Sequence, residues 1–262
     1  MKIATWNIKQ AVAPKAKLPI LWDYASQVID ADVMVFTEAK IPKEPIADEW
    51  LTIARPGGID KKRQWGTVVA ARKHEIRDIT DGVSGLRGFK VNHTWPGTVT
   101  IADLIVDGDI YATIVGVYAI TVDLDGNKTG AGHDSVPAIF DDLGGLISSR
   151  RGKRLIVAGD FNVWPIDMQD FLPKKLINVV EHTAGSRQPL FGCTGCSMGS
   201  DCGHMWTHKN GNTAGAKVQH LDNIFMSPSL VKDVISVKGG VADFPNAWDL
   251  SDHAPIVVEV KI

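Results

Sequence analysis

The chain has 262 residues, of which 44% are hydrophobic and 22% are charged, and its formal net charge is −2. This composition is typical of a globular protein with a sizeable core, and no apolar run is long enough to span a membrane. The net charge also excludes a positive electrostatic potential over the whole surface that would attract nucleic acid, so any site for a polyanion must be a local patch.

The first ten residues enter a strand-like pattern at once and lack the apolar region and cleavage site of a signal peptide. We therefore expect a cytoplasmic protein, and the three cysteines, an odd number, argue against a disulfide framework. The length allows one large α/β domain or two small ones. Because no linker, repeat or low-complexity segment divides the chain, we expect a single domain over residues 1–262, a monomer without membrane contact.

Short apolar runs predict that strands make up much of the chain. Helical spacing of apolar residues predicts an amphipathic helix over residues 20–29 and another over 139–147, which Ser135 is placed to cap. A short helix is expected near 167–172, and Asp107-Gly108-Asp109 between two strands indicates a hairpin. In chain order, the predicted strands cover residues 3–6, 33–36, 51–54, 66–72, 76–79, 89–94, 98–106, 110–118, 155–158, 221–226, 234–238 and 255–260.

The most informative stretch is LIVAGDFNVWP, residues 155–165. Its first four residues predict a strand that is apolar on both faces, and Gly159 lets the backbone leave the strand in a conformation that other residues resist. Asp160 and Asn162 then point the same way in extended chain. A carboxylate and a carboxamide at the mouth of a buried strand are costly unless they meet ligands. The alternative is an ordinary turn, because Gly, Asp and Asn are all turn residues.

Polar side chains follow other predicted strands in the same way. In α/β enzymes such strand ends converge on one rim, where ligands bind. Carboxylates and carboxamides together suit Mg²⁺ or Mn²⁺ rather than a soft metal, and His253 with Asp222 offers an acid/base pair. A turn or a local ion pair explains any one of these residues, whereas their joint placement indicates a site. The set is Asn7, Glu38, Tyr118, Asp160, Asn162, Asp222, Asp252 and His253.

Six segments, in order, resemble the signature blocks of the endonuclease/exonuclease/phosphatase superfamily. This family includes deoxyribonuclease I, exonuclease III, abasic-site endonucleases, sphingomyelinases and inositol polyphosphate 5-phosphatases. Each block is short, but six in the right order are specific. The resemblance implies a four-layer α/β/β/α sandwich of two mixed β-sheets. The segments are ATWNI (4–8), VFTEAK (35–40), VY (117–118), GDFNVWP (159–165), LDNIFMS (221–227) and SDHAPI (251–256).

The same resemblance implies a metal site. Glu38 matches the principal Mg²⁺ ligand of the family, and Asp252 matches a further ligand or a support for the metal-bound water. Asn7 matches the residue that helps hold the metal and the phosphate.

The resemblance also implies roles in hydrolysis for the remaining residues. Asp160 matches the residue that activates or orients the attacking water, and Asn162 matches a group on a phosphate oxygen. Tyr118 matches the tyrosine placed against the phosphate or the leaving group. His253, oriented by Asp222, matches the histidine that binds or protonates phosphate oxygens.

The chain departs from the family pattern at three places. Lys9 stands where the repair enzymes often carry an acidic or small polar residue, so the resemblance does not extend to a second metal position. Residues 119–121 replace the common Pro-Asn after the tyrosine, which removes the implied phosphate contact there. FTEA replaces the usual LQET, so abasic-site cleavage is not specifically implied.

A cysteine-rich segment has the pattern C-x₂-C-x₅-C-x-H, formed by Cys193, Cys196, Cys202 and His204. The first pair has the spacing of a zinc knuckle, and three thiolates with one imidazole complete a structural Zn²⁺ site. Against this, the C-x-H spacing is tight and no second C-x₂-C follows. Free thiols or an opportunistic disulfide remain the alternatives.

We therefore expect a Mg²⁺-dependent phosphodiesterase, and specifically a nuclease acting on DNA by in-line attack of an activated water. The near-neutral net charge leaves a lipid or small-molecule phosphoester open as substrate. A non-catalytic phosphate-binding module is the other alternative, which the complete set of catalytic groups opposes. Basic clusters at 61–63, 150–154 and 174–175 favour a polyanion, as do tryptophans 6, 65, 95, 164, 206 and 248 if they stack bases.

Overall fold

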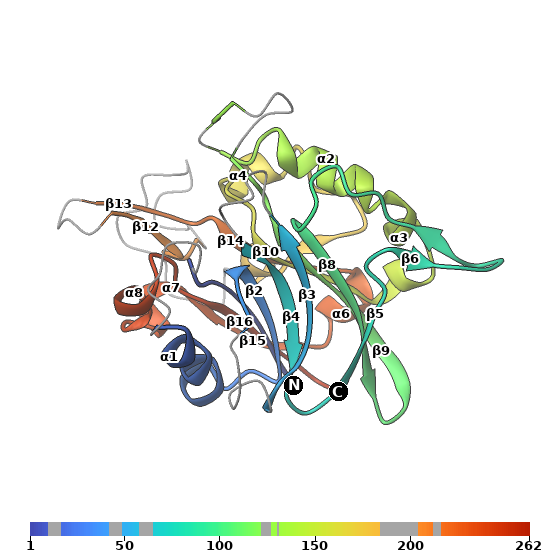
Figure 1. Ribbon diagram of the computed structural model, residues 1–262, viewed down its shortest axis with the longest axis horizontal. Helices are drawn as coiled ribbons and strands as arrows, with labels where there is room; N and C mark the ends of the chain where they lie inside the picture. The colour runs from blue at the N-terminus through green and yellow to red at the C-terminus, as the bar shows by residue number, and fades with distance from the viewer. Residues whose placement is uncertain are drawn as a thin grey trace.

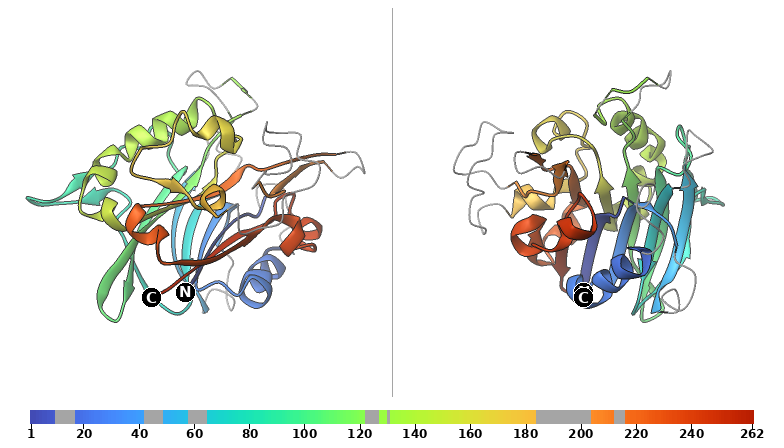
Figure 2. Two further views of the ribbon diagram at one scale, coloured as in Figure 1. Left: turned by 180° about the vertical axis from the view of Figure 1, so that it is seen from behind. Right: turned by 60° about the vertical axis from the view of Figure 1, so that its left-hand side comes forward.

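Two six-stranded mixed sheets pack face to face and carry helices on their outer faces, as Figures 1 and 2 show. The computed structural model describes residues 1–9, 17–41, 49–57, 65–121, 127–129, 131–183, 204–211 and 216–262. The arrangement confirms the expected four-layer α/β/β/α sandwich. Within the described ranges, no helix is long and apolar enough to cross a membrane.

The first sheet has parallel strands at its centre. β1 and β2 run in the same direction, with Asn7 opposite Thr37, so their carboxyl ends lie at the same edge of the sheet. The remaining neighbours pair antiparallel. In spatial order the strands are β15 (Val234–Gly239), β16 (Ile256–Val260), β1 (Lys2–Asn7), β2 (Val33–Ala39), β4 (Trp65–Ala71) and β3 (Leu51–Gly57).

The second sheet also has one parallel pair at its centre. β10 and β9 end together, with Asp160 opposite Tyr118, and the antiparallel β14 begins beside them with Asp222 opposite Asp160. Three polar residues are thereby placed in one row at the edge of this sheet. In spatial order the strands are β11 (Ile177–Asn178), β14 (Asp222–Met226), β10 (Leu155–Asp160), β9 (Asp109–Tyr118), β8 (Val99–Val106) and β5 (Glu75–Asp78).

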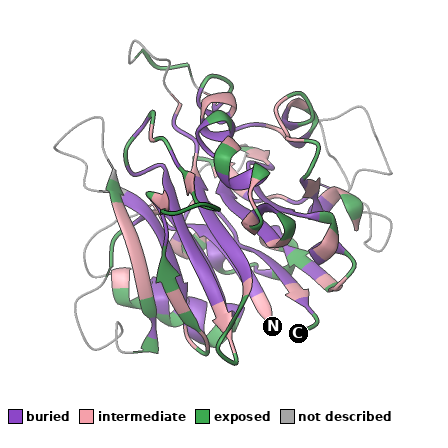
Figure 3. Ribbon diagram, turned by 90° about the vertical axis from the view of Figure 1, so that its right-hand side faces the viewer, coloured by how far each residue is buried: buried purple, intermediate pink, exposed green. Residues whose placement is uncertain are grey.

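Apolar side chains fill three layers. Val35, Ile114 and Ile156 belong to the layer between the two sheets. Figure 3 shows the central strands buried along their length, in keeping with strands that are covered on both faces. The first sheet is covered by α1 (Lys17–Tyr24) and α8 (Ala247–Leu250), and the second by α2 (Ser135–Asp142) and α3 (Gly144–Ser148).

The sequence predicted most strands within two residues, but several details were wrong. The helix expected over 20–29 is α1 followed by a π-helical turn at Ala25–Ile29. Ser135 does not cap α2, because its hydroxyl donates to the carbonyl oxygen of Ile120 at 2.8 Å. The strand over 89–94 is reduced to β7 (Phe89–Lys90), which pairs with β6 (Gly82–Val83) outside both sheets.

The predicted hairpin at Asp107-Gly108 is confirmed, because both residues have positive φ, 52° and 85°, as a tight turn between right-twisted strands requires. The remaining elements are short. They are the 3₁₀ turn Arg151–Arg154, α4 (Pro165–Met168), α5 (Val179–His182), β12 (His208–Asn210), β13 (Lys217–Gln219), α6 (Pro228–Val231) and α7 (Gly240–Asp243).

Gly159 is required by the close approach of β10 to β9. Its φ is 155°, and a Cβ built on it would lie 1.8 Å from the carbonyl oxygen of Val117. That atom belongs to the sheet backbone and cannot move without breaking the ladder. The sequence-based expectation for Gly159 is therefore confirmed.

Gly159→Ala should lower the free energy of unfolding by at least about 2 kcal/mol, because the added methyl group forces the two strands apart. Urea denaturation monitored by circular dichroism measures this. Gly144→Ala is the matched control: nothing lies within 4 Å of the added Cβ, so the change should stay below about 1 kcal/mol. Equal effects of the two substitutions would contradict the steric explanation.

Candidate active site

The polar residues predicted at strand ends meet where the two sheets share one edge. The side-chain nitrogen of Asn7 lies 2.9 Å from Asp160 Oδ2 and 3.3 Å from Glu38 Oε1. The hydroxyl of Tyr118 donates to the same Glu38 oxygen at 2.9 Å. Asn7 and Glu38 come from the first sheet, Tyr118 and Asp160 from the second. The predicted convergence on one rim is present in the structure.

A β-bulge in β2 directs the side chain of Glu38 toward the other polar residues of this rim. In β2, Phe36 pairs with Val68 and Ala39 with Gly66, so three steps along β2 match two along β4. Phe36 and Ala39 therefore both face the helix-covered core although they are three residues apart. Glu38 between them has a φ of 48°, a conformation that is strained for a non-glycine residue. Such strain is characteristic of functional sites.

Asn7 holds the two sheets' carboxylates at a fixed separation. Its amide nitrogen is shared between Glu38 and Asp160, while its amide oxygen accepts the backbone N–H of Lys9 at 3.0 Å. Its backbone carbonyl accepts the hydroxyl of Ser251 at 2.8 Å. Asn7 is fully buried, so all its polar groups are used in positioning neighbours.

Asp160 is buried, and amide N–H groups donate hydrogen bonds to both of its carboxylate oxygens. Asp160 Oδ1 accepts the backbone N–H of Asn162 at 2.9 Å, and Oδ2 receives the amide of Asn7. The Asn162 amide also donates to the carbonyl of Ala119 at 2.8 Å, and Asn162 has a φ of 50°. Burial raises the pKa of Asp160 to about 7, against the opposing effect of His253. This carboxyl group is therefore able to exchange a proton near neutral pH.

His253 lies between two carboxylates. Its Nδ1 is 2.8 Å from Asp222 Oδ2, and its Nε2 is 3.9 Å from Asp160 Oδ2. Burial opposes the charged imidazolium, but Asp222 and then Asp160 outweigh burial and raise the pKa of His253 to about 10. The backbone carbonyl of His253 accepts the indole N–H of Trp6, which fixes the loop against the core. The expected His253–Asp222 pair is thus formed.

Asp252 forms an ion pair with Lys9 through Oδ2. Its other oxygen, Oδ1, is buried and has no hydrogen-bond partner among the described residues. A buried carboxylate oxygen without a partner is costly unless a cation or a water reaches it. Asp252 and Glu38 therefore present hard oxygen atoms of the kind that Mg²⁺ prefers, and the residues expected to hold a divalent ion fit it chemically.

A second group of side chains also satisfies the spacing of a metal site. Asp160, Asp222 and His253 each offer one ligand atom, and these atoms lie within 4.8 Å of one another. Ligation by His253 requires a neutral imidazole, which its raised pKa disfavours. We therefore favour proton transfer over metal binding for these three residues.

His208 is a site neighbour that the sequence did not single out. Its ring centroid lies 4.5 Å from that of His253, and its ring accepts or donates to the side chain of Gln219 at 3.2 Å. Burial, followed by the charge on His253, lowers the pKa of His208 to about 4, so its ring is neutral. No local pattern marks it, because only the pairing of β12 with the loop before β16 brings it there.

The basic cluster at 150–154 does not form part of this rim. It precedes β10, whose opposite end carries Asp160. Arg151 binds the buried Asp103 through two hydrogen bonds of 2.8 and 3.0 Å, and Arg154 lies over the ring of Tyr111. The cluster offsets buried charge and packs on the sheet. The cluster at 61–63 lies outside the described residues.

The cysteine-rich segment is largely beyond the described residues. Cys193, Cys196 and Cys202 all fall in the range 184–203, so the structure does not test the expected Zn²⁺ site. His204 is described: it is buried and its ring packs against His220, with centroids 5.4 Å apart. The Zn²⁺ site stays a prediction.

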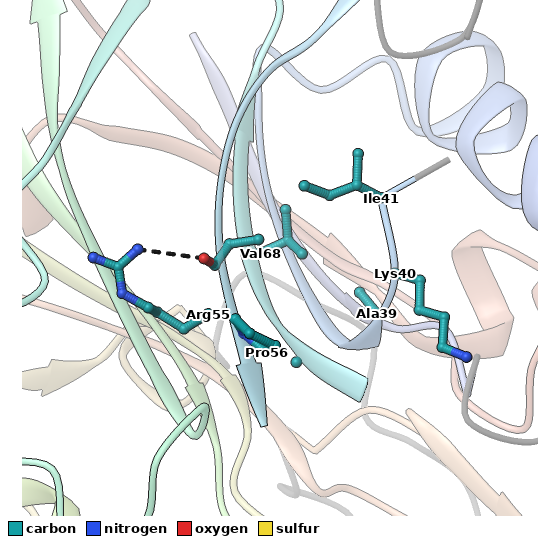
Figure 4. A pocket seen from close by; sticks show the side chains of 8 residues that line it. Ala39, Lys40, Ile41, Arg55, Pro56 and Val68 are labelled. Atoms are coloured by element: carbon teal, nitrogen blue, oxygen red, sulfur yellow. Dashed lines mark hydrogen bonds between the residues drawn. The ribbon is translucent and has the colours of Figure 1, made fainter. Parts of the chain in front are cut away.

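An apolar cavity of about 510 Å³ opens just past Glu38 along the chain. Figure 4 shows Ile41, Val68 and Pro56 around it, over the ends of β2, β3 and β4. The guanidinium of Arg55 forms an ion pair with Asp78 at 2.7 Å and donates a hydrogen bond to the backbone carbonyl of Ala54. The wall therefore offers mainly methyl and methylene groups.

Asp222→Asn should lower the pKa of His253, because Asp222 is the largest of the charges that raise it. Asp160, Asp252 and the neutral His208 also face this ring. Since the pKa is raised in the folded state, the charge pair stabilises the fold fully below about pH 6.5, and this stabilisation is lost as pH rises toward 10.

Imidazole ¹⁵N NMR titration measures the pKa, and urea unfolding across this pH range measures the stability. The stability difference between the wild type and Asp222→Asn should be largest near pH 6 and shrink toward pH 10. Asp233→Asn, which removes the half-buried partner of Arg154, should leave the titration of His253 unchanged. Titration of wild-type His253 near its ordinary value would refute the arrangement.

Comparison with known proteins agrees with this geometry. Residues 4–253 match the model of the Endonuclease/Exonuclease/phosphatase family. Comparison with curated protein sequences yields no significant match.

Three solved structures illustrate the likeness of the fold. The 3′ phosphatase NExo from Neisseria, bound to a product DNA hairpin, has 16% identity and a TM-score of 0.67, with 100% of both chains covered. An AP endonuclease from Archaeoglobus fulgidus has 16% identity and a TM-score of 0.65 over 100% of both chains. Truncated TDP2 from Caenorhabditis elegans has 13% identity and a TM-score of 0.63, covering 98% of this chain and 96% of that chain. Such identities show the fold alone, but the family match spans nearly the whole sequence, and the protein therefore belongs to the Endonuclease/Exonuclease/phosphatase family of phosphoesterases.

Proposed function

We propose that this protein is a Mg²⁺-dependent phosphodiesterase that hydrolyses DNA. The observation that carries the proposal is the pairing of His253 with Asp222 at 2.8 Å, within 3.9 Å of Asp160. A proton donor and a proton acceptor thus stand side by side at the rim where Glu38 and Asp252 offer oxygen ligands. This combination supports acid/base-assisted attack of water on phosphorus.

Asp160 and His253 divide the proton chemistry between them. With a pKa of about 7, Asp160 accepts a proton from the attacking water at neutral pH. His253, with a pKa of about 10, stays charged and presents its Nε2 proton to a phosphate oxygen or the leaving group. The 3.9 Å between Asp160 Oδ2 and His253 Nε2 leaves room for an oxygen atom that bonds to both.

The other residues position these groups. Asn7 keeps Glu38 and Asp160 at a fixed distance, and Tyr118 orients Glu38 through Oε1. Glu38 and Asp252 would hold the Mg²⁺ ion. When bound, the ion stabilises the negative charge that develops on the phosphate oxygens. Asn162 lies beside Asp160, and its amide nitrogen donates to the carbonyl of Ala119 and to Asp160. Its contact with a phosphate oxygen stays a prediction.

A small cavity beside Asp252 supports a nucleic-acid substrate. It has a volume of about 220 Å³, and Lys209 and Trp248 line it together with Asp252. The ammonium of Lys209 lies 5.6 Å from the centre of the Trp248 ring. An aromatic face and a cation next to the reacting phosphate are typical of surfaces that hold a nucleotide strand.

A phosphoester with an apolar group is the second candidate substrate. The observation that favours it is the cavity past Glu38, with Ile41, Pro56 and Val68 in its wall. A lipid chain would bury its methylene groups there. Mg²⁺-dependent hydrolysis of sphingomyelin, weakened by a polar substitution at Val68, would support this candidate instead.

Glu38→Gln should lower the rate of phosphodiester hydrolysis by several orders of magnitude and weaken Mg²⁺ binding, because the amide keeps the shape but loses the charge that attracts the ion. Steady-state kinetics over a range of Mg²⁺ concentrations measures both quantities. Glu75→Gln, at an exposed position at the start of β5, should behave as the wild type. If affinity for Mg²⁺ and rate both survive in Glu38→Gln, Glu38 is not the ligand.

The substrate class follows from a panel of duplex, single-stranded and abasic DNA, RNA, sphingomyelin and inositol phosphates, each with Mg²⁺. DNA should be hydrolysed fastest, and Trp248→Ala should raise KM for DNA roughly tenfold, on the scale of one lost stacking contact, without a comparable loss of kcat. Trp248→Phe keeps an aromatic face and should recover most of the affinity. Faster turnover of sphingomyelin or inositol phosphates than of every nucleic acid would overturn the assignment to DNA.

A further inference from the structure

Four carboxylates surround the rim, and their partners differ. Asp222 is bonded to the imidazole of His253, and Asp252 is paired with the ammonium of Lys9. Glu38 and Asp160 instead share the neutral amide of Asn7. Two of the four carboxylates therefore have a basic side chain in hydrogen-bond contact. Asp160 has only the more distant Nε2 of His253, at 3.9 Å, and Glu38 forms no ion pair with a basic side chain among the described residues.

Lys9 is held in place by its backbone as well as by Asp252. Its φ is 46°, and its N–H donates to the amide oxygen of Asn7 at 3.0 Å. This strained residue lies two positions after the end of β1. Since strain of this kind is costly, its presence here indicates that the position of the side chain matters.

The ion pair also explains the burial of Asp252. The Asp252 side chain is 17% exposed, and a carboxylate so placed is destabilising when it has no cation. Lys9 occupies one oxygen of this carboxylate, and the other oxygen of Asp252, Oδ1, has no hydrogen-bond partner among the described residues. A second divalent ion would have to displace the ammonium from Oδ2 or bind against its repulsion.

We propose that the Lys9 ammonium takes the place of a second metal ion, so that the site binds one divalent cation. Glu38 and Asp160 share the neutral amide of Asn7 and have no lysine or arginine partner among the described residues, so one such ion would balance charge on this side of the rim. Lys9 then supplies the remaining positive charge from the protein itself. The inference rests on the proposed function only in taking this rim as the metal site.

The number of bound ions tests the proposal without any substrate. Mn²⁺ is titrated into metal-free protein and the free ion is counted by electron paramagnetic resonance. The wild type should bind one Mn²⁺, and Lys9→Met should bind two, because Asp252 then carries an unpaired charge. Lys9→Arg keeps the charge and should bind one. If Lys9→Met does not fold, Lys9→Gln keeps a hydrogen-bond donor without charge and should also bind two.

Lys73→Met is the matched control. Lys73 pairs with the nearly buried Asp32 at 2.6 Å, at the start of β2 and so at the end opposite Glu38, and its loss should leave one bound Mn²⁺. In metal-free protein, Lys9→Met should have a lower Tm than Lys9→Arg, and Mn²⁺ should restore it. Two ions in the wild type, or a single ion in the uncharged Lys9 variants, would overturn the proposal. Hydrolysis is measured separately, so its absence would count against the proposed function and not against the ion count.

Discussion

The side-chain amide of Asn7 is the contact on which the site depends. One nitrogen donates to Glu38 from the first sheet and to Asp160 from the second, at 3.3 and 2.9 Å. The apolar layer between the sheets fixes their spacing, but it is not directional. This amide fixes the position of one sheet edge relative to the other, because a hydrogen bond fails when the donor is displaced by a fraction of an ångström or rotated. The residues proposed to bind metal and those proposed to transfer protons both lie around this amide.

Backbone strain is concentrated at the same edge. Lys9, Glu38 and Asn162 all have positive φ, and each is adjacent to or part of the rim. At Glu38 and Asn162 this conformation turns the side chain away from the direction that a regular strand would give. The bulge at Glu38 shows this clearly, since regular alternation would direct that carboxylate toward the helix-covered face. The rigid ladder of the sheets offsets the cost of these conformations.

Burial raises the pKa of Asp160, and the carboxylates around His253 raise the pKa of that imidazole despite its burial. Asp160 and His253 are both almost inaccessible, and both pKa values are raised, to about 7 and about 10. In water neither group would be suited to its role at neutral pH, because the aspartate would be too weak a base and the histidine largely neutral. Lys9 offsets the charge of Asp252 at the same rim through their ion pair.

The sequence alone located most of the strands, the need for glycine at Gly159 and the polar residues near the strand ends, because these depend on local periodicity and local sterics. The resemblance to a family, rather than periodicity, predicted the sandwich. Only the tertiary structure decided that Lys9 pairs with Asp252, 243 positions away, and that His208 lies against His253. Those contacts arise from how the two sheets and their loops pack. No pattern within a strand or a turn indicates which distant residue will lie opposite a given side chain.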